Sequence, residues 1–269
     1  MDSLIEIPDT LPSLLEVDEA PPFELILPRT TSPLLILCDH ARKTTPRCLG
    51  LMGLVQSDFE KHIAYDIGGE DVARELARLF DCSLFIAGYS RLVIDLNRHP
   101  GDGSSIPEVS GDIEVPANRG LSPEEITRRA NTFFWPYHNA VTEQLQRLGE
   151  NMAMPVVVSI HSFTPEYRGH ARPWHVGVLW DQDQRISQPL LERLRSEPDL
   201  CIGDNEPYHA RNPLGFTMDV HCERNGYPHV LLEIRQDLIN DKEKAHYWAS
   251  LLHRHLSGVF EQEGLLAQA

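Results

Sequence analysis

Two histidines and one glutamate interrupt or directly follow short apolar runs of this sequence. His40 follows PLLILCD, His161 follows PVVVSI, and Glu233 lies within VLLEIR. Such runs are typical of buried strands, and ligands of open α/β sheets bind beyond the carboxyl ends of the strands. Neutral imidazoles are metal ligands. The two histidines therefore predict a shared metal site, although a hydrogen-bonded structural role is the commoner one for each histidine taken singly.

An open metal site needs a third protein ligand and leaves a further position for water. Asp66 in AYDIGG is the strongest carboxylate candidate, because the glycines after it would let a helix start close to the ligand. The same position also suits the N-cap of that helix. Glu70 and Asp39 are the reserve candidates.

Glu233 stands where an apolar strand would favour another aliphatic residue. A lone buried carboxylate is costly unless it is paired or protonated. Near a water activated by the metal, Glu233 would serve as general base and then as general acid. The structural alternative is a salt bridge to Arg235, which strand alternation places on the same face.

The segment SRLVIDLNR predicts a strand with polar residues on one face. Alternation places Arg91, Asp95 and Asn97 together and leaves Arg98 free to turn in the following loop. Because the planar guanidinium group matches a carboxylate, the arginines and the amide suit the capture of a carboxylate ligand. Asp95 suits the orientation of an Arg or His. Surface ion pairs of an acidic protein are the alternative interpretation.

Two loop segments are candidates for the border of such a pocket. Residues 101–119 are numerous enough for a lid, although a loop that packs over the sheet edge explains them equally well. The later loop holds polar residues that suit either the pocket wall or plain structural and surface positions: Tyr208, His209, Arg211 and His221.

Short apolar runs alternate with longer amphipathic stretches along the chain, which is the pattern of an α/β fold. Ser122-Pro123-Glu124-Glu125 adds the N-terminal signal of a helix that runs to about residue 149. We therefore expect a three-layer α/β/α sandwich with a mixed, largely parallel sheet. The expected strands cover residues 33–39, 82–88, 90–97, 155–160, 175–180 and 228–235, and the other expected helices cover 68–80, 186–194 and 241–256.

Composition limits the class of protein. The first 30 residues carry seven acids, one base and five prolines, which favours an extended arm, and residues 31–269 then form a single catalytic domain. The net charge of −16 argues against a general nucleic-acid or anionic-membrane face. No apolar run approaches the roughly 20 residues of a membrane helix, and the acidic start differs from a secretory signal, so we expect a cytoplasmic protein. Five scattered cysteines without a CxxC pair argue against a thiolate zinc site.

Several of these motifs together resemble the N-formylglutamate amidohydrolase family. SRLVIDLNR, S-x-HS-F and PHVLLEIRQDL carry the resemblance, with support from HIAYDIGGEDVARELA and PANRGLSPEE, and it extends over roughly residues 34–256. The family is similar to the zinc carboxypeptidases and aspartoacylases. The resemblance therefore implies a phosphorylase/hydrolase-like α/β/α fold.

The resemblance also implies roles for particular residues. His40 and His161 would ligate one zinc ion or another divalent metal, and Glu233 would be the general base. The carboxypeptidase pattern has a Glu three residues after the first His, where this chain has Lys43, and Asp66 is our choice for the third ligand. The segment CDHARKTTP also differs from the His-Ser-Gly of well-known members, which suggests a side branch.

By the same resemblance, Arg91, Asn97 and Arg98 would hold the substrate carboxylate, and Arg91 would polarise the scissile carbonyl. The implied reaction is hydrolysis of N-formyl-L-glutamate to formate and L-glutamate, a step of histidine catabolism. The partner is a small anionic N-acyl amino acid, and a homo-oligomer is left open.

Three alternatives to this reaction follow from the residues. An aspartoacylase-like or peptide-cleaving enzyme would use the same metal site with another pocket. A cysteine hydrolase would use Cys38 or Cys222 with an adjacent base. A non-catalytic binding module would keep Arg91 and Arg98 without needing Glu233.

Overall fold

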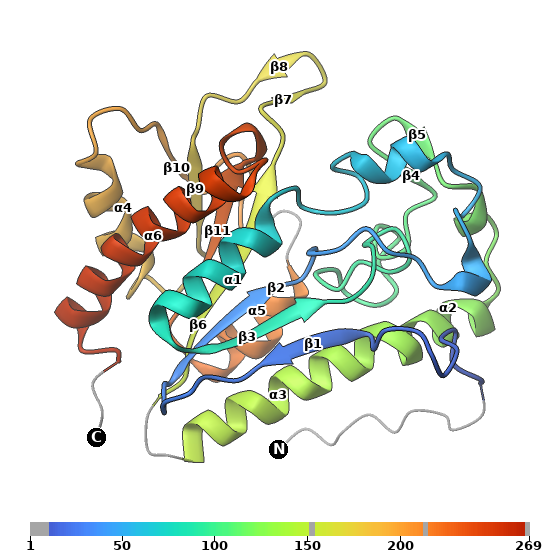
Figure 1. Ribbon diagram of the computed structural model, residues 1–269, viewed down its shortest axis with the longest axis horizontal. Helices are drawn as coiled ribbons and strands as arrows, with labels where there is room; N and C mark the ends of the chain where they lie inside the picture. The colour runs from blue at the N-terminus through green and yellow to red at the C-terminus, as the bar shows by residue number, and fades with distance from the viewer. Residues whose placement is uncertain (1–10, 151–153, 212–214, 267–269) are drawn as a thin grey trace.

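A seven-stranded mixed sheet forms the middle layer of the protein (Figure 1). The computed structural model describes residues 11–150, 154–211 and 215–266. Strands β3, β2, β6 and β11 are parallel, β1 and β9 run antiparallel to their inner neighbours, and β10 is parallel to β9. Across the sheet the strands are β1 (Phe23–Ile26), β3 (Ser83–Ala87), β2 (Leu34–Cys38), β6 (Val156–Phe163), β11 (His229–Arg235), β9 (Val176–Leu179) and β10 (Ile202–Asp204).

Helices cover both faces of this sheet (Figure 1). Val72, Leu76, Trp248 and Leu252 belong to the apolar core on one face, and Tyr137 belongs to the core on the other. Helices α1 (Gly69–Phe80), α4 (Ser187–Arg195) and α6 (Lys242–Glu263) cover the first face, and α2 (Pro123–Arg129), α3 (Trp135–Glu150) and α5 (Phe216–His221) lie on the second. The predicted three-layer α/β/α fold with a mixed, largely parallel sheet is confirmed.

The central strands β2 and β6 begin with runs of apolar residues because both of their faces are covered. Every residue of β2 and every residue of β6 is buried. A strand covered on both faces loses the alternation of apolar and polar residues. This explains why LLILC and VVVSI are continuous apolar runs.

The helix expected over residues 122–149 contains a change of hydrogen-bonding pattern. Ser122 and Glu125 form the expected reciprocal capping bonds, and Pro123 is the first helical residue. After α2, residues Ala130–Phe134 make a π-helical turn (η4) that leads directly into α3. The helical stretch is therefore continuous, but it consists of two α-helices joined by a π-turn.

The strand expected over residues 90–97 is wrong. The structure has turns there, since Ser90 Oγ accepts a hydrogen bond from the Leu92 amide and Asp95 Oδ1 accepts one from the Asn97 amide. Side-chain bonds of this kind compete with a sheet ladder. Both edges of β3 are also already paired with strands, one with β1 and the other with β2.

The edge strand β1 lies within the first 30 residues, where composition predicts an extended arm. Its residues pair antiparallel with those of β3, and Phe23 lies opposite Ala87. Glu24 of this strand binds the guanidinium of Arg74 at 2.7 Å. Residues 23–26 are thus part of the sheet, and residues 1–10 lie outside the described residues.

The remaining elements are short. Asn118 Nδ2 donates to the carbonyls of Leu92 and Pro107, and Asn118 Oδ1 accepts a hydrogen bond from Arg129, so the loop of residues 101–119 packs against its surroundings. No helix among the described residues is both long and apolar enough to cross a membrane. The hairpins are β4–β5 (Val109–Ser110, Ile113–Glu114) and β7–β8 (Glu166–Tyr167, His170–Ala171), and the 3-10 helices are η1 (Arg47–Leu49), η2 (Gln56–Glu60), η3 (Pro116–Asn118), η5 (Glu223–Asn225) and η6 (Gln236–Leu238).

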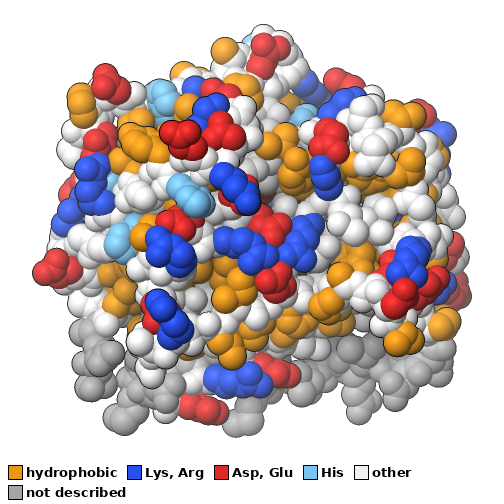
Figure 2. All heavy atoms as spheres, viewed as in Figure 1, with side chains coloured by type: hydrophobic (Ala, Val, Ile, Leu, Met, Phe, Trp, Pro, Cys, Tyr) orange, Lys and Arg blue, Asp and Glu red, His pale blue; other side chains and the backbone are white. Residues whose placement is uncertain are grey.

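Charged side chains of both signs lie interspersed on the surface. On the face shown in Figure 2, lysine and arginine side chains lie next to acidic ones without a broad basic area. Glu24, Arg42, Glu70 and Arg74 form one such mixed cluster.

Candidate active site and metal centre

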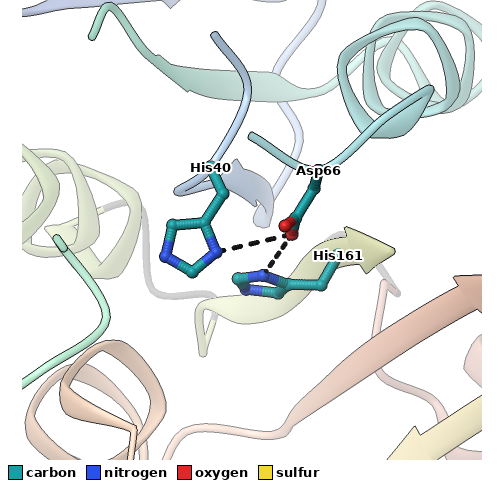
Figure 3. A group of neighbouring side chains, drawn as sticks. All are labelled: His40, Asp66 and His161. Atoms are coloured by element: carbon teal, nitrogen blue, oxygen red, sulfur yellow. Dashed lines mark hydrogen bonds and ion pairs between the residues drawn. The ribbon is translucent and has the colours of Figure 1, made fainter. Parts of the chain in front are cut away.

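His40, Asp66 and His161 converge beside the central strands, although they come from distant parts of the chain (Figure 3). Asp66 Oδ2 lies 3.4 Å from His40 Nδ1 and 2.9 Å from His161 Nδ1. One nitrogen or oxygen atom of each residue lies within 4.8 Å of the other two, and all three side chains are buried. The two imidazole rings meet edge to face, with centroids 4.9 Å apart.

The sheet and one glycine position these three residues. His40 follows β2 and His161 lies in β6, and these neighbouring strands are parallel, so both histidines reach the same edge of the sheet. The Asp66 amide donates to the His40 carbonyl at 2.8 Å. Gly68 then directly precedes α1 with φ +79°, where a Cβ would lie 2.1 Å from the Ile239 carbonyl oxygen. Only glycine fits there, and Gly68 rather than Asp66 is the N-cap.

The reserve carboxylates have other partners. Glu70 binds Arg42 and Arg74 on the outside of α1. Asp39 accepts hydrogen bonds from the Tyr137 hydroxyl at 2.5 Å and from Thr217 Oγ1 at 2.7 Å. Asp66 is therefore the carboxylate that the fold places between the two histidines.

A second carboxylate lies behind each histidine. His40 Nε2 lies 2.7 Å from Asp95 Oδ1, and His161 Nε2 lies 3.8 Å from Asp39 Oδ2. An outer carboxylate that hydrogen-bonds to an imidazole, as Asp95 does to His40, orients a ring that ligates a metal ion. The arrangement leaves the Nδ1 atoms of both rings facing Asp66.

The donor set and the charges fit a divalent cation. Two imidazoles and one carboxylate are the ligands of many catalytic zinc sites, and the buried His40 Nδ1 has no hydrogen-bond partner in the part of the chain that the structure describes. Burial and the Arg91 charge oppose a proton on His40, but Asp95 and Asp66 outweigh them and raise the pKa of His40 to about 9. Burial alone would raise the pKa of Asp66, yet His40 and His161 hold it well below its usual value. The site thus attracts positive charge.

Glu233 adjoins this group from strand β11. It pairs in register with His161 of β6, and its buried Oε2 atom has no hydrogen-bond partner among the described residues. Burial raises the pKa of Glu233 to about 7, although the His161 charge acts in the opposite direction. Arg235 binds Asp237 instead, at 2.8 Å, so the expected alternative of a Glu233–Arg235 salt bridge is wrong.

Arg91 bridges the two buried carboxylates on its side of the site. Its Nη1 lies 3.6 Å from Asp66 Oδ1 and its Nη2 lies 2.5 Å from Asp95 Oδ2. The partners of Arg91 are therefore buried groups of the site and not surface acids. Burial opposes ionisation of Asp95, but Arg91 and His40 hold the pKa of Asp95 well below its usual value.

Asn97 and Arg98 complete the polar wall. Asn97 Oδ1 accepts a hydrogen bond from the Thr217 amide at 3.1 Å. Arg98 Nη1 donates to the Asn97 carbonyl at 3.2 Å, and no ion pair joins Arg98 to a carboxylate within the part of the chain that the structure describes. Its charge is thus available to a ligand.

These side chains enclose one cavity of about 160 Å³. All seven residues expected at the site line it, and Tyr208 and His209 do so as well. Arg211 instead binds Asp181, and His221 is buried against His138. The full lining is His40, Asp66, Arg91, Asn97, Arg98, His161, Ser162, Leu179, Tyr208, His209, Ala210, Gly215, Leu231 and Glu233.

Two polar residues at this site were not among the expected ones. Ser162 lines the cavity, and its Oγ donates to the Ile67 carbonyl at 2.9 Å. The S-x-HS-F motif that singled out His161 contains Ser162 and was a signal for it. Arg172 adjoins Tyr208, which lies 36 residues further along the chain, so no local pattern indicates this contact.

The family of the chain follows from comparison with known proteins. The fold and the family model together define the class of protein as an amidohydrolase: residues 32–240 match the model of N-formylglutamate amidohydrolase. The chain belongs to this family. A relative from Pseudomonas aeruginosa, N-formylglutamate deformylase, is 28% identical over 217 residues, which cover 74% of this chain and 70% of the relative.

Two solved structures share the fold. Gene product Atu2144 from Agrobacterium tumefaciens has 30% sequence identity and a TM-score of 0.90, with 93% of this chain and 98% of that chain covered. N-formylglutamate amidohydrolase from Ralstonia eutropha has 18% identity and a TM-score of 0.68, with 92% and 98% covered. The second likeness shows the fold alone.

Proposed function

We propose that this protein is a metal-dependent deformylase that hydrolyses N-formyl-L-glutamate to formate and L-glutamate. The observation that carries the proposal is the placement of Glu233 beside His40, Asp66 and His161 on the wall of a single cavity. The family and the name of the Pseudomonas aeruginosa relative support the choice of substrate. The proposed setting is histidine catabolism in the cytoplasm.

His40, Asp66 and His161 would hold the metal, one zinc ion per chain or another divalent cation. When bound, such an ion lowers the pKa of water toward ~7 and polarises a carbonyl group. With three protein ligands, such an ion would keep a position for water or substrate. The rest of the proposed mechanism depends on residues of the chain itself.

Glu233 is suited to move the proton. Glu233 lines the cavity, its Oε2 atom has no hydrogen-bond partner among the described residues, and a pKa of about 7 lets the carboxylate accept a proton near neutral pH and return it. As the water oxygen bonds to the formyl carbon, Glu233 would take the water proton. When the carbon–nitrogen bond breaks, Glu233 would give that proton to the departing amine of glutamate.

The arginines and the amide would orient the substrate. Arg91 lines the cavity beside Asp66, where its positive charge would stabilise the negative charge that develops on the formyl oxygen. Arg98, which has no carboxylate partner among the described residues, would bind a substrate carboxylate with Asn97 beside it. Fixed orientation of this kind lowers the barrier by reducing the entropy lost at the transition state.

The cysteine-hydrolase alternative does not fit the structure. Cys38 and Cys222 are both fully buried, and burial raises the pKa of each thiol well above its usual value. Neither side chain lines the cavity. A thiolate nucleophile at either position would therefore be both suppressed and out of reach.

The test is formate release from N-formyl-L-glutamate by zinc-loaded protein, with chelator-treated protein beside it. We expect release that requires the metal and is restored by adding zinc back. Cys38→Ser serves as the control for the thiol alternative and should keep the activity. Formate release that survives verified metal removal would overturn the metal-dependent proposal, and absence of release from metal-bound protein would overturn the proposed substrate.

A further inference from the structure

Arg172 lies beside the cavity with neutral hydrogen-bond partners. Its Nη1 donates to the Tyr208 hydroxyl at 3.1 Å and to Thr164 Oγ1 at 3.3 Å. No ion pair joins it to a carboxylate within residues 11–150, 154–211 and 215–266. An arginine without a carboxylate is notable in a protein with 40 acidic and 24 basic residues.

Three aromatic rings, two from residues 163–167 and one from Tyr208, surround the Arg172 guanidinium. Its central carbon lies 4.7 Å from the ring centroid of Tyr167, 4.9 Å from that of Tyr208 and 5.8 Å from that of Phe163. The Arg172 amide also donates to the Pro165 carbonyl, which closes the β7–β8 hairpin. Stacking against aromatic faces leaves the edge of a guanidinium free for planar hydrogen bonds. The cation is thus oriented before any ligand arrives.

Tyr208 extends this group into the cavity. Its side chain lines the cavity, and its hydroxyl oxygen accepts the bond from Arg172. Within the described residues no acceptor receives the hydroxyl proton of Tyr208. That proton and the remaining Arg172 N–H groups are all donors, and donors grouped around a positive charge suit a carboxylate.

The cavity contains a second cation and an apolar wall. Arg98 is the other arginine of the site without a carboxylate partner among the described residues. Leu179 and Leu231 line the same cavity and suit the methylene groups of a side chain. Two available cations and an apolar surface match a ligand with two carboxylates joined by methylene groups.

We propose that Arg172 and Tyr208 form a second carboxylate site, which selects substrates with an acidic side chain, while Arg98 binds the α-carboxylate. The inference rests on the proposed function and names the residues that determine its specificity. A purely structural role for Arg172, as a clamp between the β7–β8 hairpin and the Tyr208 loop, is the competing explanation. Such a clamp would affect every substrate equally.

The experiment compares kcat/KM for N-formyl-L-glutamate with kcat/KM for N-formyl-L-glutamine, its neutral isostere. The variants are Arg172→Gln and Tyr208→Phe, and Arg168→Gln is the matched control, because Arg168 is an exposed arginine of the same hairpin that stacks on Tyr167 at 5.3 Å. Hydrogen bonds to a charged group are strong enough that Arg172→Gln should lower kcat/KM for the glutamate substrate by roughly 30- to 100-fold, chiefly through KM. For N-formyl-L-glutamine, kcat/KM of the same variant should change by less than about threefold. Tyr208→Phe should lower kcat/KM about tenfold for N-formyl-L-glutamate and leave kcat/KM for N-formyl-L-glutamine unchanged.

Equal losses on both substrates would overturn the second carboxylate site and favour the clamp, as would a wild-type protein that does not distinguish the two substrates. Failure of the proposed function is a different result, namely no formate release from either substrate by the wild-type protein. In that case calorimetric titration with L-glutamate and L-glutamine decides the inference without turnover. Tighter binding of L-glutamate that disappears in Arg172→Gln supports it, and equal binding of the two ligands overturns it.

Discussion

Glu233 of β11 and His161 of β6 occupy the same register position on adjacent parallel strands. Side chains at the same register of neighbouring strands lie on the same face of the sheet. The sheet itself therefore fixes the proposed base next to a proposed metal ligand. The His161 charge lowers the pKa of Glu233, while burial raises it more strongly, and the result is a carboxyl group that titrates near neutral pH.

We expect Glu233→Gln to abolish most of the activity without loss of metal. Glutamine keeps the shape of the side chain but cannot accept the proton, and general-base catalysis contributes roughly 10²–10⁴-fold to a rate. The measurement is kcat for formate release together with zinc content per chain. A variant that keeps full zinc occupancy and more than about a tenth of the wild-type kcat would show that another group is the base.

The same substitution should stabilise the metal-free protein above neutral pH. The pKa of Glu233 rises from its ordinary 4.5 to about 7 on folding, so the folded state binds more protons than the unfolded state between these values. The free energy of unfolding then falls as the pH rises from 4.5 to 7. Above pH 7 the ionised Glu233 lowers it by about 3 kcal/mol. Denaturant unfolding of metal-free protein should show Glu233→Gln to be more stable than wild type at pH 8, with the difference reduced at pH 4.5. A difference that does not depend on pH would contradict the shifted carboxyl group.

Asp95→Asn should weaken metal binding, because Asp95 Oδ1 lies 2.7 Å from His40 Nε2 and orients the ring. Loss of an outer carboxylate typically costs 10- to 100-fold in metal affinity. Competition titration with a zinc-binding dye measures this, and a thermal melt checks that the variant is folded. Asp112→Asn, at an exposed aspartate, is the control. A folded Asp95→Asn protein with wild-type zinc affinity would show that Asp95 does not contribute to metal binding through His40.

Metal binding should release a proton from His40. In the metal-free protein the Asp95 and Asp66 carboxylates, against burial and Arg91, raise the pKa of His40 to about 9, so the ring is protonated at pH 8 and must lose its proton to ligate. Glu233 is already ionised at that pH. Calorimetric titration with zinc at pH 8, in buffers of different ionisation enthalpy, should report about one proton released by His40, and the apparent affinity should rise as pH increases toward 9. Zinc binding whose affinity is unchanged from pH 7 to pH 9 would contradict protonation of His40.

Local patterns were sufficient for much of the fold and for part of the site. The continuous apolar runs before His40 and around Glu233 correctly indicated strands that carry polar residues toward the carboxyl edge of the sheet. A strand buried on both faces needs apolar side chains at successive positions, and such a run is visible in the sequence. SRLVIDLN also has the apolar content of a strand, but β1 occupies the ladder beside β3, and Ser90 and Asp95 bond to the local backbone. The spacing of apolar residues along the sequence does not by itself distinguish a buried turn from a strand.

The chain by itself determined which residue types stand at the ends of buried strands, because hydrophobic burial and strand alternation are local properties of neighbouring residues. Tertiary structure decided which carboxylate joins the two histidines, since Asp66 meets His161 across 95 residues of sequence. It also decided the pKa of Glu233 and the aromatic surroundings of Arg172. These depend on burial and on distances between groups that only the order of strands in the sheet brings together.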